Sequence, residues 1–267
     1  MTRPFPTKNL RFYLTAPAPC PYLAGRRERK VFTSLDGVDA AGLNDALTHA
    51  GFRRSQNIAY RPACDACDAC VSARVRAEDF DLTRRWRKVL GRNADLSRAL
   101  RPGEATEEQF WLLRRYLQAR HTNGGMADMT LVDYGSMVEE SAVRTHIVEY
   151  RYTTGPNAGE LAAAALVDVL RDGLSLVYSY FDPRDPKRSL GAFTILDHIQ
   201  QARAAGFPHV YLGYWVRGSE KMGYKSDFQP LELLVAGQWT PFRLGGERLD
   251  QRRAQPRKPR WIIGGKR

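Results

Sequence analysis

The stretch from residue 146 to residue 216 constrains the fold more than any other part of the sequence. Three apolar segments of strand length come first, at 146–152, 160–170 and 174–181, and Arg-Asp-Gly between the last two is a hairpin signal. A helical pattern follows at 189–206, and a further strand is predicted at 209–216. The apolar stripe of the helix consists of Ala192, Ile195, Ile199 and Ala202. The order β-β-β-α-β predicts an antiparallel meander and a crossover helix within an α+β fold.

The first hundred residues carry shorter elements. Residues 40–51 are typical of a helix that ends at a left-handed Gly51, and residues 52–62 are predicted to form one strand broken by Pro62. A strand at 71–80 and a basic helix at 83–96 follow. Arg-Pro-Gly-Glu-Ala-Thr at 101–106 is typical of a loop, and Thr106 with Gln109 forms a capping box for the next helix. We therefore expect two domains, 1–100 with the cysteines and 101–267.

Positive charge is in excess along the chain. Its 267 residues contain 41 Lys and Arg against 29 Asp and Glu, a formal net charge of +12, which favours a polyanionic partner such as nucleic acid. The segment 243–267 holds nine basic residues against two acids, and Arg-Arg-Trp-Arg-Lys at 84–88 adds an aromatic side chain suited to base stacking. Neither a secretory signal nor a run of about 18 apolar residues is present, so we expect a cytoplasmic protein without a membrane partner.

Three of the four cysteines lie within seven residues, at Cys64, Cys67 and Cys70, and the fourth is Cys20. Cys-x2-Cys is a spacing of metal ligands, because a short turn can direct both sulfur atoms to one ion. Four thiolates suit zinc or an iron–sulfur cluster. Disulfides and free thiols are the alternatives that the sequence leaves open. The cysteine cluster therefore predicts a small module that is held together through its cysteines, but it does not indicate an activity.

The wider pattern around these cysteines resembles the arginyl-tRNA–protein transferase family, most closely its bacterial branch, the aspartate/glutamate leucyltransferases. The resemblance runs from about residue 5 to residue 240 and rests on segments that recur in this order: "CPYLAGRRERKVF" (20–32), "GFRRSQNIAYRPACDACDACVSARV" (51–75), "RRWRKVLGRNADL" (84–96), "YLQARHTNGGM" (116–126), "SYFDPRDPKRSLGAFTILDHI" (179–199) and "YLGYWVRGSEKMGYKSDFQPLELL" (211–234). It implies an acetyltransferase-like (GNAT) C-terminal domain beside the small cysteine-bearing domain.

The resemblance also implies an activity, the transfer of an amino acid from an aminoacyl-tRNA to the N-terminal α-amine of a protein. The acceptor begins with Asp or Glu, and the product is marked for degradation as an N-degron. Eukaryotic members carry Cys-x-x-Cys and a later Cys-Cys pair that is associated with an iron–sulfur cluster. In this sequence Leu23 occupies the position of the second cysteine of the Cys-x-x-Cys pair that begins at Cys20. Binding of an iron–sulfur cluster therefore cannot be transferred from those members residue by residue.

The segment 178–191 is the expected reaction centre, because it runs from a strand end into a helix N-terminus. An aminoacyl ester is already activated, so the chemistry requires no cofactor and depends on positioning and on oxyanion stabilisation. The candidates to relay the proton of the amine are Tyr178, Tyr180 and Asp182, although Asp182 can equally be a turn former before Pro183. The candidates for tRNA binding are Lys187, Arg188, Ser189, Gly191, Lys221 and Lys225, with an N-cap as the alternative for Ser189 and a solvated surface as the alternative for the two later lysines.

Two further assignments concern the substrates. Arg74 and Arg76 are candidates to bind the Asp or Glu carboxylate of the acceptor, since an arginine fork matches a carboxylate, and an exposed strand face is the alternative. His121 is more typical of a structural residue than of a general base.

The donor is the second point that the sequence addresses. The stretches beside the expected reaction centre are apolar, and Asp182 is their only acidic residue, which favours Leu-tRNA over Arg-tRNA as donor. An acyl-CoA acyltransferase and a non-enzymatic RNA-binding module with a thiolate metal site are the rival classes.

Overall fold

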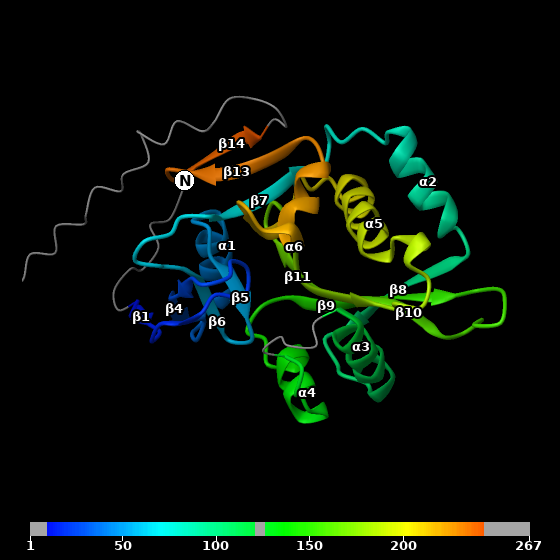
Figure 1. Cartoon of the computed structure of the whole chain (residues 1–267), viewed down its shortest axis with the longest axis horizontal. Coiled ribbons are helices and arrows are strands. Elements are labelled where there is room, and N and C mark those ends of the chain that lie inside the picture. Colours follow the sequence, from blue (N-terminus) through cyan, green and yellow to red (C-terminus); the bar gives the residue numbers. More distant parts are fainter. Residues whose placement is uncertain (1–9, 121–125, 243–267) are drawn as a thin grey trace, which may run out of the picture.

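The computed structural model describes residues 10–120 and 126–242, which form two main sheets with helices around them (Figure 1). The strands are β1 (Tyr13–Leu14), β2 (Ala18–Pro19), β3 (Arg27–Glu28), β4 (Lys30–Ser34), β5 (Arg53–Ser55), β6 (Ile58–Pro62), β7 (Cys70–Arg76), β8 (Leu96–Pro102), β9 (Thr145–Tyr152), β10 (Leu161–Leu170), β11 (Gly173–Phe181), β12 (His209–Val216), β13 (Leu231–Val235) and β14 (Gln238–Phe242). The helices are α1 (Ala40–His49), α2 (Arg84–Arg92), α3 (Glu107–Arg120), α4 (Leu131–Glu139), α5 (Leu190–Ala204) and α6 (Glu220–Gly223), with 3₁₀ turns η1 (Pro186–Arg188) and η2 (Tyr224–Asp227).

The larger sheet has eight strands in the order β14-β13-β7-β12-β11-β10-β9-β8. Strands β9, β10 and β11 are antiparallel neighbours, and α5 then leads to β12, which is parallel to β11. The predicted meander and crossover helix are therefore confirmed, and so is the α+β class that an acetyltransferase-like core requires.

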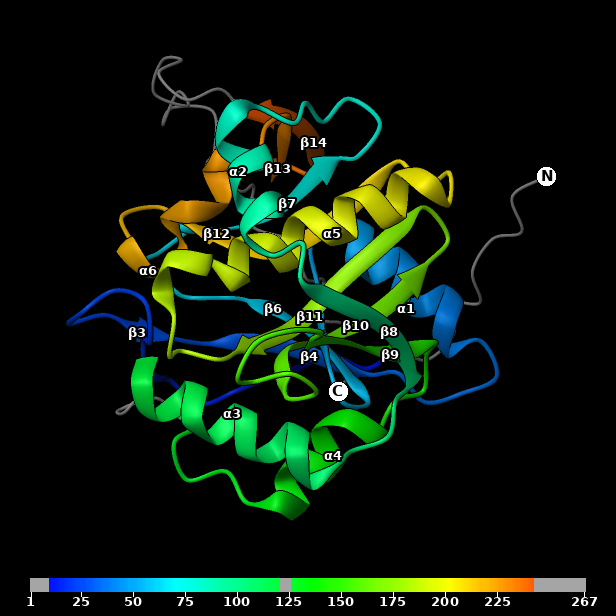
Figure 2. The ribbon, with the colours of Figure 1, turned by 90° about the vertical axis from the view of Figure 1, so that its right-hand side faces the viewer.

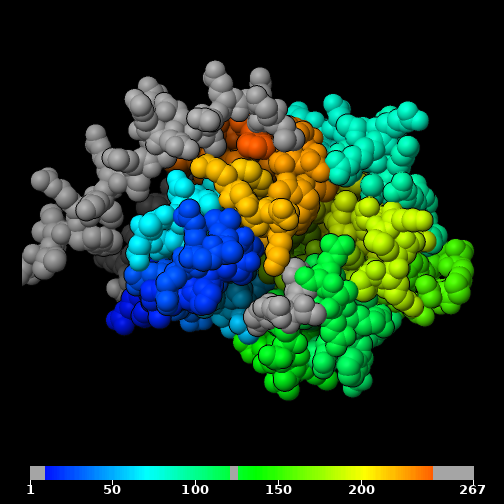
Figure 3. Space-filling view, viewed as in Figure 1, coloured from blue at the N-terminus to red at the C-terminus, as the bar shows by residue number. Residues whose placement is uncertain are grey.

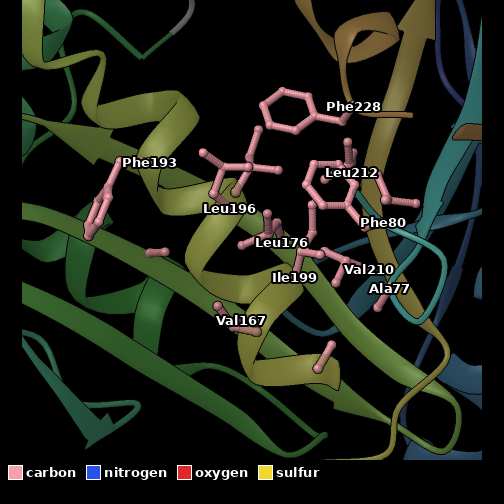
Figure 4. Close-up of a cluster of buried hydrophobic side chains, with 14 of the residues drawn as sticks. Ala77, Phe80, Val167, Leu176, Phe193, Leu196, Ile199, Val210, Leu212 and Phe228 are labelled. Atoms are coloured by element: carbon pink, nitrogen blue, oxygen red, sulfur yellow. The ribbon is translucent and has the colours of Figure 1, made fainter. Parts of the chain in front are cut away.

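Helices cover both faces of this sheet. Figure 2 shows α5 and α2 on one side of the strands and α3 and α4 on the other. The side chains of β10 alternate accordingly, because Ala163, Ala165 and Val167 belong to the core under α5, whereas Ala164 and Leu166 belong to the core under α3. The core under α5 also includes Phe193, Leu196, Ile199, Leu176, Leu212 and Phe228 (Figure 4).

The N-terminal lobe consists of α1 against a four-stranded sheet of order β1-β4-β6-β5. The predicted helix at 40–51 is confirmed, and Gly51 after it has a left-handed φ of +87°. The single strand predicted at 52–62 is wrong, because β5 and β6 form an antiparallel hairpin. Gln56 turns the chain between them with a φ of +50°. A run of polar residues at 55–57 supplies this turn, which a strand prediction from apolar residues alone did not detect.

The segment from residue 70 to residue 102 joins the larger sheet. Strand β7 lies between β12 and β13, and β8 forms the edge beside β9. The predicted basic helix is correct at its start but too long, because α2 ends at Arg92 and β8 begins at Leu96. Residues 101 and 102, predicted as loop, extend β8 because β9 offers them backbone partners. The predicted domain division at residue 100 does not coincide with a division between sheets, and as a domain boundary it remains a prediction.

The predicted capping box at the start of α3 is present. The backbone N–H of Gln109 donates to the hydroxyl of Thr106 over 3.2 Å, and the side-chain carbonyl of Gln109 accepts from the N–H of Thr106 over 3.1 Å. Among the helices of the described ranges, none combines the length and the apolar character needed to cross a membrane.

Candidate active site

The loop between β11 and α5 carries most of the expected reaction centre. Asp182 follows the strand and is 2% exposed, and both of its carboxylate oxygens accept hydrogen bonds from Nε of Arg184, at 3.0 and 2.7 Å. Burial opposes the charge of Asp182, but the hydrogen bonds and the charge of Arg184 outweigh it, so the pKa of this carboxyl is lowered. The hydroxyl of Tyr152 lies 3.4 Å from the same carboxylate. Asp182 is therefore an ionised, ion-paired group and not only a turn former.

The two tyrosines proposed for proton relay lie on the α3 side of the sheet. The hydroxyl of Tyr180 is 2.7 Å from that of Tyr134, which donates to Gln109 in a buried chain of hydrogen bonds. Burial raises the pKa of Tyr180 well above its usual value, and burial also raises the pKa of Tyr178. No hydrogen bond within the described chain joins either tyrosine to Asp182. Their relay role therefore remains a prediction.

Arg188 holds the start of α5 against the end of α2. Its guanidinium donates to both oxygens of Asp95, at 2.8 and 2.6 Å, and lies 5.1 Å from the centre of the Tyr152 ring. Arg92 of α2 donates to the backbone carbonyl of Lys187 over 2.9 Å, while the side chain of Lys187 is exposed. Arg188 thus holds the helix start in place, whereas the side chain of Lys187 is accessible to a phosphate, and tRNA binding by either residue remains a prediction.

Ser189 and Gly191 begin α5, as expected. Ser189 is the N-cap residue, but its φ is +55° and its side chain makes no capping hydrogen bond, so the first amides of the helix have no side-chain cap. A Cβ on Gly191 would lie 2.9 Å from the ring of Phe181, so glycine here permits close packing of α5 on β11. A 15-residue helix with uncapped amides at its N-terminus favours an anion nearby.

A basic groove of about 430 Å³ lies beside this helix start. Its lining combines the exposed face of α2 with the N-cap of α5, namely Arg84, Arg85, Lys88, Val89, Arg92 and Ser189. The basic cluster predicted from the sequence therefore reaches the expected reaction centre. The base-stacking role expected for Trp86 is wrong, because the indole is 4% exposed and stacks on Phe228 at 4.7 Å.

Lys221 and Lys225, predicted as a pair, differ in environment. Lys221 is exposed on α6, whereas Lys225 on η2 is 6% exposed and its Nζ donates to the carbonyl of Tyr214 over 2.7 Å. The solvated alternative therefore does not apply to Lys225. Burial, and then the positive charge of Arg53, lower its pKa from 10.5 to about 7.

The two arginines proposed for the acceptor also differ. Arg74 is 8% exposed, donates to Glu232 over 2.7 Å and stacks 4.4 Å from the ring of Trp239. Arg76 is exposed, pairs with Asp79 and lines a groove of about 570 Å³ that two further aspartates also line. Both guanidinium groups already have carboxylate partners, and their role toward an acceptor remains a prediction.

The four cysteines come together where the N-terminal lobe meets β12. None is in a disulfide, and Cys67 and Cys70 pack with Tyr214 and Tyr22. Burial, and then the neighbouring thiols of Cys20, Cys64 and Cys67, raise the pKa of Cys70 to about 12, so this thiol is neutral when no cation lies beside it. No group of three or more His, Cys, Asp and Glu side chains within residues 10–120 and 126–242 is arranged to hold a metal ion. Zinc or iron–sulfur binding by the four cysteines therefore remains a prediction.

Sequence reasoning missed Arg53 and Arg54, which are adjacent on β5. Arg54 is buried and pairs with Asp168 at 2.6 Å, while Arg53 enters the large sheet between β11 and β12. The doublet was visible in the sequence, but only the strand pairing reveals its surroundings. His121 and the basic segment 243–267 lie outside the described residues.

Two family models match this chain. The model described as arginine-tRNA-protein transferase, N terminus, matches residues 18–88, and the C-terminus model of the same enzyme matches residues 108–235. An aspartate/glutamate leucyltransferase from Phenylobacterium zucineum is 64% identical over 241 residues, which cover 90% of this chain and 94% of that protein. The chain belongs to the arginine-tRNA-protein transferase family.

Further relatives in this transferase family carry the same name. The aspartate/glutamate leucyltransferase of Caulobacter vibrioides strain NA1000 is 62% identical, covering 90% of this chain and 86% of that protein. The one from Maricaulis maris is 59% identical, covering 90% and 93%. Similarity to solved structures is weaker: L-PGS from Bacillus licheniformis has a TM-score of 0.41 at 14% identity, over 58% of this chain and 49% of that chain. That similarity is too weak to bear on the activity.

Proposed function

We propose that this protein transfers leucine from Leu-tRNA to the N-terminal α-amine of proteins that begin with Asp or Glu. The observation that carries the proposal is the relationship to proteins named aspartate/glutamate leucyltransferase, at 57–64% identity over about 90% of the chain. These names favour leucine over arginine as the donated residue. The location of a basic groove beside the uncapped start of α5 supports the use of a charged tRNA.

The reaction exchanges an ester for an amide. The neutral α-amine of the acceptor attacks the carbonyl carbon of the leucyl ester, a C–N bond forms, and the C–O bond to the terminal ribose of the tRNA breaks. The amine loses a proton and the ribose oxygen gains one, so the exchange is balanced without an oxidant or a metal ion. An α-amine has an ordinary pKa of about 7.7 to 8.0, so a useful fraction is neutral near pH 7. Positioning of the two substrates is therefore the main task of the protein.

The groove between α2 and α5 is suited to the phosphates near the 3′ end of the tRNA. Arg84 and Lys88 project from α2 into the groove, and the uncapped amides of α5 begin at its other wall. Phosphates bind well to such helix starts, and basic side chains add attraction that does not depend on sequence. Lys187, exposed in the loop before α5, extends the same surface.

Asp182 best serves as a positioning group in this scheme. Its carboxyl has a lowered pKa, so it is a weak base at neutral pH, and its bonds to Arg184 fix the loop between β11 and α5. Arg188 fixes the other end of that loop through Asp95. The loop that faces the ester is thereby held between two ion pairs. The modified protein would carry an N-terminal leucine that directs it to degradation. We propose the cytoplasm as the location of the reaction.

A transfer assay tests the function. Purified protein is mixed with equal concentrations of radiolabelled Leu-tRNA or Arg-tRNA and a peptide that begins with Asp, and labelled peptide is counted after the charged tRNA is removed. We expect leucine transfer to this peptide and to its Glu counterpart, and little transfer to a peptide that begins with Lys. A higher rate from Arg-tRNA would refute the donor assignment, and no transfer from either tRNA would refute the proposed function.

A further inference from the structure

Strands β11 and β12 are neighbours over only a short distance. Residues 173–175 pair with residues 209–211, after which β11 continues to Phe181 and β12 to Val216 without pairing each other. Backbone carbonyls on the facing edges therefore need partners other than a strand. Two cationic side chains supply them.

Arg53 of β5 reaches into this divergence from the N-terminal lobe. Its Nη2 donates to the carbonyls of Leu176 and, over 3.5 Å, of Val177, both on β11. On the other side its guanidinium lies against the backbone of Gly213 in β12, where a Cβ would come within 2.6 Å of Nη1. Gly213 has a φ of +78°, so both its backbone conformation and this close approach favour glycine. The guanidinium thus spans the opening between the two strands.

The second nitrogen of this guanidinium has no partner. Nη1 of Arg53 is buried and donates to no hydrogen-bond acceptor among the described residues. The buried arginines Arg54 and Arg74 are neutralised, because Arg54 pairs with Asp168 and Arg74 pairs with Glu232. Neither Arg53 nor Lys225, which donates to the carbonyl of Tyr214 in the same opening, forms an ion pair with an acidic side chain of residues 10–120 or 126–242. A guanidinium with a buried, unpaired N–H group and no anion beside it is unfavourable, so this place is suited to a negatively charged ligand, which would also favour the charged form of Lys225.

We propose that Arg53, with Lys225 beside it, binds the side-chain carboxylate of the Asp or Glu that begins the acceptor protein. The inference rests on the proposed function and names how that function selects its acceptor. One free guanidinium nitrogen matches one carboxylate oxygen, whereas Asn or Gln at the same position would leave the positive charge unmatched. Arg74 already has Glu232 as its carboxylate, so Arg53 is better suited to this role than the two arginines that the sequence suggested.

The site lies close to the surface of the molecule. Arg53 is itself partly exposed, and its charge influences the pKa of Tyr224, a residue of η2 that is 48% exposed. Figure 3 shows this orange segment on the surface, between the blue N-terminal lobe and the yellow α5. A tRNA phosphate is the other anion that two cations could bind. The exposed cations beside α5 already offer a place for phosphates, which favours the carboxylate here.

The experiment compares two peptides that differ only in their first residue, Asp or Asn. For Arg53→Met, we expect kcat/KM with the Asp peptide to fall by about 10- to 100-fold, because a charge-assisted hydrogen bond is lost. The kcat/KM with the Asn peptide, which is much lower in the wild type, should change by less than about threefold in the variant. The Kd for Leu-tRNA should also change by less than about threefold. Arg53→Lys keeps the charge and should retain part of the selectivity. Arg61→Met is the matched control, since Arg61 is an exposed arginine on the neighbouring strand β6 that stacks on Phe52.

Two results would overturn the inference. An equal loss with both peptides would mean that Arg53 only supports the strands, and weaker Leu-tRNA binding with unchanged selectivity would mean that the anion is a phosphate. Hydrogen exchange of the wild-type protein decides the matter if Arg53→Met does not fold. The Asp peptide should slow amide exchange around Arg53 and Gly213 more than the Asn peptide does, and equal exchange with both would refute the site. A wild-type protein that transfers no leucine would instead refute the proposed function, because the exchange measurement needs no transfer.

Discussion

Two cations of α2 offer a quantitative test of the tRNA surface. Of the basic residues along the groove, Arg85 forms an ion pair with Asp227 at 2.9 Å, and Arg92 donates to a backbone carbonyl. Arg84 and Lys88 form no ion pair with any described residue, so their charges are available to a polyanion. The informative perturbation is therefore the double variant Arg84→Gln, Lys88→Gln, which removes two unpaired charges and leaves the buried face of α2 intact.

The expected effect follows from the release of counterions. Each neutralised phosphate adds about 0.7 to 0.9 to the slope of log K against log salt, so two lost contacts should flatten the slope by about 1.4 to 1.8. At about 0.15 M salt the same two contacts correspond to a loss of about 15- to 30-fold in affinity for Leu-tRNA. The Kd is measured by filter binding at several salt concentrations between about 50 and 300 mM, where this term changes most.

Arg85→Gln is the matched control for this measurement. Its charge is already compensated by Asp227, so its removal should flatten the slope by clearly less than half of the change in the double variant. An unchanged slope in the double variant would remove this face of α2 from the tRNA surface. A loss in Arg85→Gln as large as that in the double variant would show that ion pairing in the free protein does not determine which cations bind tRNA.

Three further predictions concern stability and the thiols. Arg54→Met should lower the free energy of unfolding by about 3 to 5 kcal/mol, measured in urea, because Asp168 is left buried and charged, and replacing both partners by apolar residues should recover most of the loss. The pKa of Lys225 falls from 10.5 to about 7 on folding, so the folded protein releases this proton first as the pH rises and stability should increase between about pH 7 and pH 10.5. Lys225→Met should therefore gain most, relative to the wild type, below about pH 7, and a gain independent of pH would contradict the burial of an ammonium there. Cys67→Ser should lower the free energy of unfolding, or the zinc or iron content in elemental analysis, and should leave the single-turnover rate of transfer nearly unchanged. A variant that folds normally but transfers no leucine would instead indicate a nucleophilic thiol.

The central part of the fold could be predicted because its signals are local. Period-two apolar segments, the hairpin at residues 171–173 and the stripe of α5 each depend on residues close in sequence, and β9, β10, β11, α5 and β12 followed as expected. The capping box of Thr106 and Gln109 is equally local, and both of its hydrogen bonds are present. Elements of this kind are determined by neighbours in the chain, so an alignment with other proteins is not needed to place them.

The elements that the sequence did not place depend on partners far along the chain. Strand β7 lies between β12 and β13, more than 130 residues later, and nothing in its own pattern specifies that position. Trp86 looked available because its neighbours are basic, but Phe228 covers it from a distant loop. The burial of Lys225 was also not visible in the sequence, because it depends on contact with Tyr214 of the distant strand β12. Long-range packing decides exposure, and exposure decides which of these side chains can meet a substrate.

The same reasoning explains why net charge alone could not identify the functional arginines. A formal charge of +12 counts every guanidinium equally, yet Arg54 and Arg188 are held by Asp168 and Asp95 and contribute to the architecture. A guanidinium that is already matched to a carboxylate has little to gain from a second anion, because binding that anion would first require separating the existing pair. Arg84 and Arg53 lack such partners within the described chain; Arg84 lies at an exposed groove, whereas Arg53 is partly exposed and has a buried Nη1 between β11 and β12. An exposed cation tolerates the many phosphates of a nucleic acid, whereas a buried one discriminates a single carboxylate from its neutral amide. If both proposals hold, unpaired charge at these two depths accounts for a general affinity for tRNA and a specific choice of acceptor in one molecule.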